Sequence, residues 1–277
     1  MTCAEQQREP YRDLFIYYIK GRISGSPIFK DSDFIGNWEE AQDSFLFFRQ
    51  PADERVRQLL RKQPHLSLQD QFQMSYEQWQ GGTLAPCRIG AFHVVPPWHT
   101  QAATLTPKTI VLDPGVVFGT GAHPTTSDCL AALQLAFEVQ PIATVIDIGT
   151  GTGLLALAAA CLGAERVLAV DLNLLAVQTA QANVRHNQMT ERILVAQGNA
   201  MNFMDISSDL MVSNIHYAVM RQLIAEPGFA RHRRFILSGL LRSQARDIEN
   251  QLLRLHVQIE HKWEQQGIWF TFYGRWK

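Results

Sequence analysis

The 277-residue sequence lacks several features that would assign it at once to a class of protein. Its four cysteines have neither the spacing of a zinc site nor that of a disulfide framework. Lysine and arginine number 25 and aspartate and glutamate 26, so the basic excess of a nucleic-acid-binding domain is missing. The most apolar segment, residues 154–163, is too short to span a membrane, and the first ten residues hold no apolar signal region. We therefore expect a monomeric cytoplasmic protein that neither enters a membrane nor binds nucleic acid directly.

The order of the expected strands and helices indicates two domains of different construction. A helix is predicted to begin at Pro51, because proline suits the first turn of a helix. Strands are predicted at residues 13–20, 35–38, 44–49 and 66–74. Residues 1–75 are therefore expected to form a small α+β domain, comparable to a reduced ferredoxin-like unit. Residues 76–100, which contain Gly81 and Gly82, are expected to form a hinge-like linker to a larger domain over residues 101–277.

The larger domain repeats a pattern of strand, loop and helix. Strands are expected at residues 145–148, 166–170, 193–196, 210–213 and 235–238. Helices are expected at residues 154–162, 174–186, 217–225 and 241–255. This alternation predicts an α/β fold with a doubly wound, mostly parallel sheet and helices on both of its faces. Two consecutive strands at residues 257–263 and 268–275 then predict an antiparallel C-terminal hairpin.

A glycine-rich turn follows the first of these strands, in the segment Val145-Ile-Asp-Ile-Gly-Thr-Gly-Thr-Gly153. Gly149 allows a sharp turn, and Gly151 and Gly153 allow the backbone to approach a ligand closely. Asp147 lies just ahead of the turn, where a carboxylate suits a cationic or hydroxyl-rich ligand better than a pyrophosphate. S-adenosylmethionine (SAM) carries an ammonium and a sulfonium and no phosphate. The pattern therefore favours a SAM-dependent methyltransferase over a tight turn that binds nothing.

A second acid, Asp171, ends the next apolar strand. A carboxylate at this position accepts two hydrogen bonds from a ribose diol, but nicotinamide-binding proteins use the same arrangement. Asp171 alone therefore does not separate the two cofactors. The spacing of the turn does, because it reads G-x-G-x-G, and Leu154 occupies the position where G-x-G-x-x-G needs its third glycine.

Four segments together are more specific than the glycine turn. They are Phe118-Gly-Thr-Gly-Ala-His-Pro-Thr-Thr126, the turn itself, Val170-Asp-Leu-Asn173 and Ser213-Asn-Ile215. In this order they resemble the ribosomal protein L11 methyltransferase family, from about Tyr76 to the C-terminus. The resemblance implies a class I methyltransferase fold, SAM as cofactor and methyl transfer to lysine or N-terminal amines of a protein. It also implies that the small N-terminal domain recognises the protein substrate, for which ribosomal protein L11 is a candidate.

The resemblance also implies roles for individual residues. Asn214 would lie beside the sulfonium and orient the incoming amine, so that the amine lone pair faces the methyl group. Thr126 would contact the cofactor, and Phe118 and Thr120 would lie near it. Asn199 follows the third strand, at a position that usually faces the adenine.

Some of these polar residues also have simpler structural explanations. Asn214 could cap the helix that starts near Tyr217. His216 stands where the family usually has leucine, and we expect an exposed loop histidine there rather than a base. His123 has no second ligand at metal spacing, so a structural hydrogen bond is the better expectation.

Three alternative functions remain open at this point. A methyltransferase of the same fold could act on a different protein, a small molecule or a nucleic acid, although the balanced charge argues against nucleic acid. A nicotinamide-dependent oxidoreductase is disfavoured by the glycine spacing. A module that binds SAM without catalysis is disfavoured by the presence of Asn214.

Overall fold

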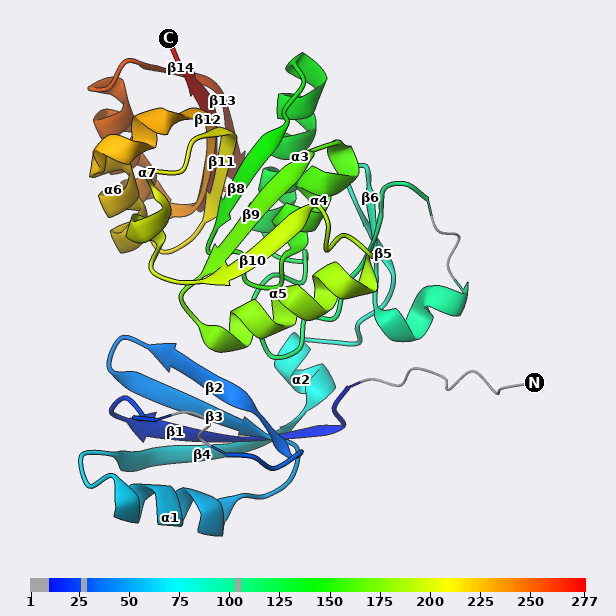
Figure 1. The fold of residues 1–277 in the computed structure, drawn as a ribbon, viewed down its shortest axis with the longest axis vertical. Helices are drawn as coiled ribbons and strands as arrows, with labels where there is room; N and C mark the ends of the chain where they lie inside the picture. Colours follow the sequence, from blue (N-terminus) through cyan, green and yellow to red (C-terminus); the bar gives the residue numbers. More distant parts are fainter. Residues whose placement is uncertain (1–9, 26–28, 103–105) are drawn as a thin grey trace. The chain divides into compact units, whose positions relative to one another are not determined.

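The structure, a computed structural model, describes residues 10–25, 29–102 and 106–277. The chain divides into two compact units, residues 1–84 with 173–175 and residues 85–172 with 176–277 (Figure 1). The division between residues 84 and 85 falls inside the segment expected to be a linker. Each unit has an apolar core of its own, because one buried cluster lies wholly within residues 15–66 and the other two within residues 89–276.

The first unit is an antiparallel sheet with one covering helix. Its strands are β1 (Asp13–Lys20), β2 (Phe34–Glu40), β3 (Asp43–Phe48) and β4 (Ser67–Ser75), in the order β2-β3-β1-β4. Helix α1 (Asp53–Lys62) packs Val56 and Leu59 into a cluster with Leu46 and Phe48 of β3. The expected strands and helix are all found, and no helix joins the first two strands within the residues described.

The segment expected to be a hinge contains a short, well-capped helix. Helix α2 (Tyr76–Gln80) begins with a capping box, in which the side chains of Ser75 and Gln78 each bind the other residue's backbone N–H. It ends at Gly81, whose φ of 75° is the left-handed conformation that suits glycine after a helix. The glycine pair therefore terminates a helix.

The second unit contains a seven-stranded sheet in the order β10-β9-β8-β11-β12-β14-β13. The strands β8 to β12 are parallel, and β12, β14 and β13 pair antiparallel. Their bounds are β8 (Thr144–Ile148), β9 (Arg166–Asp171), β10 (Ile193–Gln197), β11 (Ser208–Asn214), β12 (His232–Leu241), β13 (Val257–Gln265) and β14 (Trp269–Trp276). The expected mostly parallel α/β sheet with an antiparallel C-terminal hairpin is confirmed.

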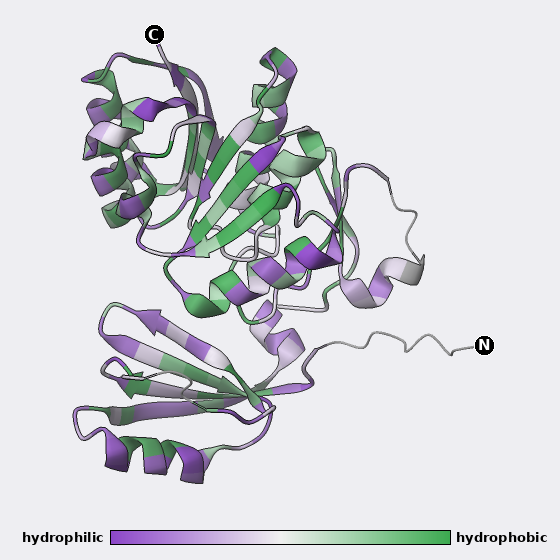
Figure 2. Cartoon of the chain, viewed as in Figure 1, coloured by the Kyte–Doolittle hydropathy of each residue, from purple (hydrophilic) through white to green (hydrophobic). Residues whose placement is uncertain are grey.

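Apolar clusters cover both faces of this sheet. Successive side chains of a strand point to opposite faces, and Val145 and Ile146 of β8 accordingly belong to different clusters. On β11, Leu210 and Val212 belong to the first cluster and Met211 to the second. Figure 2 shows β8 and β9 as mainly hydrophobic strands. The first cluster includes residues of α3 (Pro124–Val139) and α4 (Leu154–Leu162), and the second those of α6 (Tyr217–Ala225) and α7 (Arg242–Leu253). Helix α5 (Leu174–His186) completes the α-helices of the described chain.

Two differences from the expected elements have local causes. Residues 87–95, inside the segment expected to be a linker, form two strands, because Gly90, with φ of 57°, turns the chain between β5 (Cys87–Ile89) and β6 (Phe92–Val95). These two strands and β7 (Thr109–Val111) form a separate three-stranded sheet. Helix α3 was not expected, and it starts where Pro124 follows the capping residue His123.

Short 3₁₀ helices occupy some of the connections, at Pro97–Ala102, Ala200–Phe203 and Pro227–Arg231. Among the residues described, none of the helices has both the length and the apolar character needed to cross a membrane.

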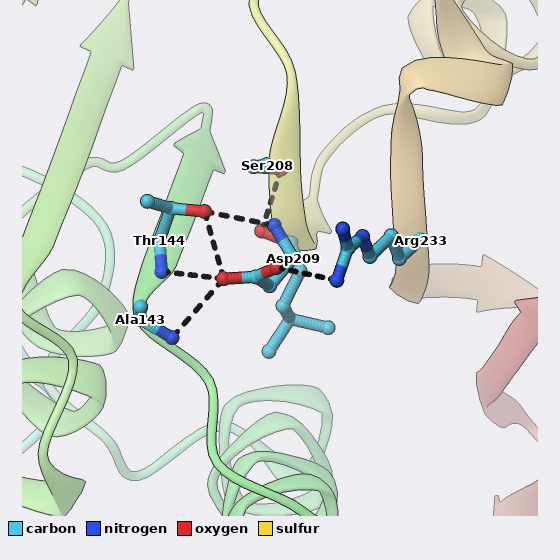
Figure 3. A network of polar contacts seen from close by, with 6 residues as sticks. Ala143, Thr144, Ser208, Asp209 and Arg233 are labelled. Atoms are coloured by element: carbon cyan, nitrogen blue, oxygen red, sulfur yellow. Dashed lines mark hydrogen bonds and ion pairs between the residues drawn. The ribbon is translucent and has the colours of Figure 1, made fainter.

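A partly buried polar network joins the amino ends of β8, β11 and β12 (Figure 3). Asp209 Oδ2 accepts hydrogen bonds from the backbone N of Ala143 at 3.1 Å and from the N and Oγ1 of Thr144 at 2.9 and 3.0 Å. Arg233 Nη1 lies 3.5 Å from Asp209 Oδ1. Burial alone would raise the pKa of Asp209, but the hydrogen bonds from Thr144 and Ala143 and the charge of Arg233 hold it below its ordinary value.

We predict that Asp209→Asn lowers the free energy of unfolding by about 2 kcal/mol at pH 7, the scale of hydrogen bonds to a charged group. Because the folded pKa is below the unfolded one, this stabilisation is present above the unfolded pKa of about 3.9 and is lost as the pH falls through the folded value. Urea unfolding at pH 7 and pH 3 measures both effects. Asp205 pairs with Arg231 at 3.3 Å but is 89% exposed, so Asp205→Asn is the matched control. Equal losses in the two variants would contradict the prediction.

Candidate functional site

The carboxyl ends of the parallel strands bring the predicted site residues to one edge of the sheet. Gly149 follows β8, Asp171 ends β9, Asn199 follows β10 and Asn214 ends β11. Because these strands are parallel and adjacent, their ends meet at the same edge, where ligands bind in open α/β sheets. Residues that lie up to 65 positions apart in the sequence are thereby placed on neighbouring loops.

The glycine turn needs glycine at each of its predicted positions. Gly149, Gly151 and Gly153 have φ of 75°, 56° and 84°, a region that other residues rarely adopt. A Cβ on Gly149 would overlap Cγ2 of Ile215, and one on Gly151 would lie 2.7 Å from the carbonyl oxygen of Phe118. The turn is therefore packed between the loop that follows β11 and the loop that carries Phe118.

Asp171 is tied to the glycine turn. Its Oδ2 accepts a hydrogen bond from the backbone N of Gly151 at 3.0 Å. The backbone N atoms of Gly149 and Thr150 also bond to the carbonyl of Val170, at 2.8 and 3.0 Å. These bonds extend the pairing of β8 and β9 into the turn and fix the carboxylate at the edge of the sheet.

Asp147 lies beneath the turn and is 1% exposed. Its Oδ2 accepts a hydrogen bond from Thr150 Oγ1 at 2.6 Å, and within the described residues Oδ1 has no partner of ordinary hydrogen-bond geometry. Burial raises the pKa of Asp147 to about 7, against the opposing effect of the Thr150 hydrogen bond. Because Asp147 is buried, we infer that it shapes the turn through its bond to Thr150 and does not form an exposed ion pair with a ligand. The predicted contact with the cofactor remains a prediction.

The loop from Phe118 to His123 is held against the glycine turn. Thr152 Oγ1 donates to the carbonyl of Gly119 at 2.8 Å. Thr120 Oγ1 accepts from the backbone N of Ala122 at 3.3 Å, which stabilises the bend of the loop. The Phe118 ring is 56% exposed, an unusual state for a large apolar side chain beside a candidate site. The loop that carries Phe118 and Thr120 is therefore packed against the glycine turn, and the expected position of both residues near the cofactor remains a prediction.

Thr126 carries a buried hydroxyl that has no partner in the described part of the chain. The residue is 2% exposed and lies in the first turn of α3. A buried polar atom without a hydrogen bond costs roughly 1–3 kcal/mol. A ligand that supplied this bond would remove the cost, so the position fits the predicted cofactor contact.

Asn214 does not cap a helix. Helix α6 begins at Tyr217, and the capping position is His216, whose side chain makes no capping bond and is exposed. The Asn214 amide instead donates to Thr125 Oγ1 at 3.2 Å. His123 makes the kind of structural hydrogen bond that was expected, because its Nδ1 accepts from the backbone N of Thr125 at 3.4 Å and caps α3.

Asn199 has a structural role that the sequence had not indicated. Its Oδ1 accepts from the backbone N of Met201 at 3.0 Å and caps the 3₁₀ helix that follows β10. The residue is exposed, and a contact of its amide with an adenine remains a prediction. Across the described residues, His, Cys, Asp and Glu form no group of three or more that could hold a metal ion.

Asn183 of α5 and Asn187, the residue just after that helix, position the loop that leads to Phe118, and the sequence analysis missed both. Asn187 Oδ1 accepts from the N of Val111 at 2.9 Å, and its Nδ2 donates to the carbonyl of Val111 at 2.6 Å. Asn183 bonds in the same way to Asp113 N and O, each at 2.8 Å, and its Nδ2 also reaches the carbonyl of Thr152 at 2.9 Å. The available signal was a pair of asparagines four residues apart at the C-terminal end of an expected helix.

Comparison with known proteins agrees with this geometry. A sequence profile described as ribosomal protein L11 methyltransferase (PrmA) matches residues 28–277. A ribosomal protein L11 methyltransferase from Desulfitobacterium hafniense is 38% identical over 236 residues, which are 81% of this chain and 73% of that protein. One from Anoxybacillus flavithermus is 36% identical over 188 residues, 66% of this chain. This match spans 59% of the Anoxybacillus protein, less than two thirds of its length.

A solved structure supports the same assignment and the class I methyltransferase fold. The crystal structure of ribosomal protein L11 methylase from Lactobacillus delbrueckii subsp. bulgaricus has a TM-score of 0.62 at 30% identity. The alignment covers 70% of this chain and 100% of that one. Because the family profile covers most of the sequence and its motifs meet at one edge of the sheet, the protein belongs to the ribosomal protein L11 methyltransferase family.

Proposed function

We propose that the protein is a SAM-dependent N-methyltransferase that transfers methyl groups to lysine or N-terminal amines of a protein substrate. The observation that carries the proposal is the family match over residues 28–277, together with the meeting of its motif residues at the carboxyl edge of the parallel sheet. The names of the relatives make ribosomal protein L11 the first substrate to test.

The residues at this edge fit SAM in chemical type. Asp171 offers a carboxylate to a ribose diol, and the turn from Gly149 to Gly153 offers close backbone approach. Thr126 offers a buried hydroxyl without a partner in the described chain. Phe118 and Thr120 would lie over the cofactor, and Asn199 would face its adenine. Asp147 would act beneath the turn, because it is buried there.

Bound SAM would supply a methyl group on its sulfonium; the amine nitrogen would bond to the methyl carbon in line with the C–S bond that breaks, S-adenosylhomocysteine would leave, and the methylated ammonium would lose a proton to water. The protein's own part is to hold the amine, which must be neutral because an ammonium has no lone pair. Asn214 would accept an N–H of the amine on its carbonyl oxygen and so direct the lone pair toward the methyl carbon. Orientation of this kind supplies a large part of the rate in reactions between two bound groups.

The first unit would recognise the protein substrate. Its core is complete within residues 15–66, and none of the residues assigned to the cofactor or to the amine lies in it. If a separate unit recognises the substrate, a change of protein target requires no change in the cofactor site.

We predict that the purified protein transfers labelled methyl groups from SAM to ribosomal protein L11, and that Asn214→Ala lowers kcat by about tenfold or more. Affinity for S-adenosylhomocysteine should stay within about threefold, because the amine is absent from that complex. Mass spectrometry of L11 and calorimetry measure the two effects.

Transfer to another protein but not to L11 would change the proposed substrate. No transfer to any protein would overturn the function, and unchanged turnover of the variant would remove the role of Asn214.

We predict that Asp171→Ala weakens S-adenosylhomocysteine binding by about tenfold or more, since a hydrogen bond to a charged group is worth about 1.5–3 kcal/mol. Asp171→Asn keeps one acceptor oxygen and should bind with intermediate affinity. Calorimetric titration gives both values, and thermal unfolding checks that loss of the bond to Gly151 has not unfolded the turn. Wild-type affinity in both variants would show that Asp171 does not contact the ribose.

We predict that residues 85–277 expressed alone bind S-adenosylhomocysteine with the affinity of the full chain but do not methylate the protein substrate. This segment contains both apolar clusters of the large sheet, and the first unit contains neither. Calorimetry and the methylation assay test the two halves of the statement. A folded fragment that still methylates the substrate would exclude recognition by the first unit.

A further inference from the structure

A chain of hydrogen bonds runs from His123, in the loop before α3, to Asn214 at the end of β11. His123 Nδ1 lies 2.7 Å from Thr125 Oγ1, and Thr125 Oγ1 lies 3.2 Å from Asn214 Nδ2. Thr125 is 1% exposed, so water does not compete for its hydroxyl. A residue that sequence analysis had not singled out thus contacts the proposed amine-orienting residue directly.

The direction of each bond follows from the donors available. The backbone N of Thr125 also bonds to His123 Nδ1, at 3.4 Å, and a backbone N–H only donates. Nδ1 must therefore be an acceptor, which places the ring proton on Nε2. Burial lowers the pKa of His123, which favours this neutral ring at pH 7. The single hydroxyl proton of Thr125 then goes to Nδ1, and its oxygen has only lone pairs left for Asn214.

These directions distinguish the two orientations of the Asn214 amide. With the NH₂ group toward Thr125 the amide makes a hydrogen bond, as observed at 3.2 Å. With the amide rotated by half a turn, Oδ1 would face a hydroxyl oxygen whose proton is already donated, and two acceptors would oppose each other. The neutral ring of His123 therefore selects, through Thr125, the orientation in which the carbonyl of Asn214 points away from Thr125.

The neighbouring strand leaves room for that carbonyl. Gly239 of β12 has φ of 87°, and a Cβ there would lie 2.9 Å from Asn214 Oδ1. The register of β12 against β14 shifts between Leu237 and Leu240, around this glycine. Ser238 Oγ lies 3.4 Å from the carbonyl of Thr125, which links the same irregular segment to the start of α3. Thr125 thus holds the Nδ2 side of the amide, and the lack of a side chain at Gly239 leaves space on the Oδ1 side.

We propose that His123 and Thr125 are positioning residues, which hold the Asn214 amide with its carbonyl toward the acceptor amine. The inference rests on the proposed methyl transfer. It assigns to the histidine of the Phe-Gly-Thr-Gly-Ala-His-Pro-Thr-Thr segment a hydrogen-bonding role, although its ring also contacts two aromatic rings. The ring centroid of His123 lies 5.5 Å from that of Phe118 and 4.9 Å from that of Trp269.

Matched variants at position 123 separate the hydrogen bond from the aromatic contacts. His123→Phe keeps a ring between Phe118 and Trp269 but removes the acceptor. His123→Asn removes the ring but keeps an acceptor of the kind preferred at a helix start. We expect kcat for the protein substrate to fall about tenfold or more in His123→Phe, and His123→Asn to recover most of that loss. The reverse order would show that the ring contacts matter and would overturn the inference.

A second pair tests the hydroxyl of Thr125. Thr125→Val has nearly the same shape without the hydroxyl, and Thr125→Ser restores the hydroxyl. We expect the valine variant to lose about tenfold or more in kcat, the serine variant to recover most of it, and the KM for the protein substrate and the affinity for S-adenosylhomocysteine to change less than threefold in both. Wild-type kcat in Thr125→Val, or equal loss in both variants, would overturn the inference.

A measurement without turnover separates this inference from the proposed function. Nitrogen-15 NMR of the full chain at pH 7.5, assigned with His123→Asn, reports which ring nitrogen of His123 carries the proton. We expect the proton on Nε2, and the Asn214 side-chain amide signals to shift in Thr125→Val. A proton on Nδ1 would overturn the inference even in an active enzyme. A wild-type protein that transfers no methyl group would overturn the proposed function, while the NMR result would still decide the direction of the hydrogen bonds.

Discussion

The parallel pairing of β8, β9 and β11 is the constraint on which the candidate site depends. It carries the glycine turn, Asp171 and Asn214 to the same edge of the sheet from three separate parts of the sequence. The turn then has no room for side chains, because Ile215 and the carbonyl of Phe118 occupy the space that a Cβ would need. One edge of one sheet thus decides where the glycine turn, Asp171 and Asn214 meet.

Sequence patterns predicted the parallel sheet and the glycine turn, because the chemistry of neighbouring residues determines these elements. Apolar strands that alternate with helices indicated the parallel sheet, and glycines after β8 indicated a turn with positive φ. The details that were missed depend on contacts between distant residues. The bond from Asn214 to Thr125 joins residues 89 positions apart. The burial of Asp147 also depends on packing, since the sequence places an acid before the turn but does not say whether it lies on the turn or beneath it.

The two units differ in how far local sequence patterns determine their structure. The first has a small core and a helix, α1, without a side-chain cap, and its elements followed directly from proline, strand patterns and apolar spacing. The second contains a polar network at each end of its parallel sheet. At the amino ends Asp209 ties neighbouring strands together, and at the carboxyl ends Asp171 ties a strand to a loop. The polar network at the amino ends is thereby separate from the predicted site residues at the carboxyl ends.

The pair Asn183 and Asn187 has a further consequence for β7. Each side-chain amide offers one donor and one acceptor, as a peptide group does, and each binds both the N–H and the carbonyl of one residue, 113 or 111. Four residues of helix rise about 6 Å and two residues of strand about 6.6 Å, so the two spacings nearly match. Asn183 near the end of α5 and Asn187 just after it therefore offer hydrogen bonds as the edge of a neighbouring strand would. The backbone of residues 111–113 is therefore not available to pair with another chain. Glutamine has a longer side chain and aspartate has no N–H donor, so neither would make the same pair of hydrogen bonds.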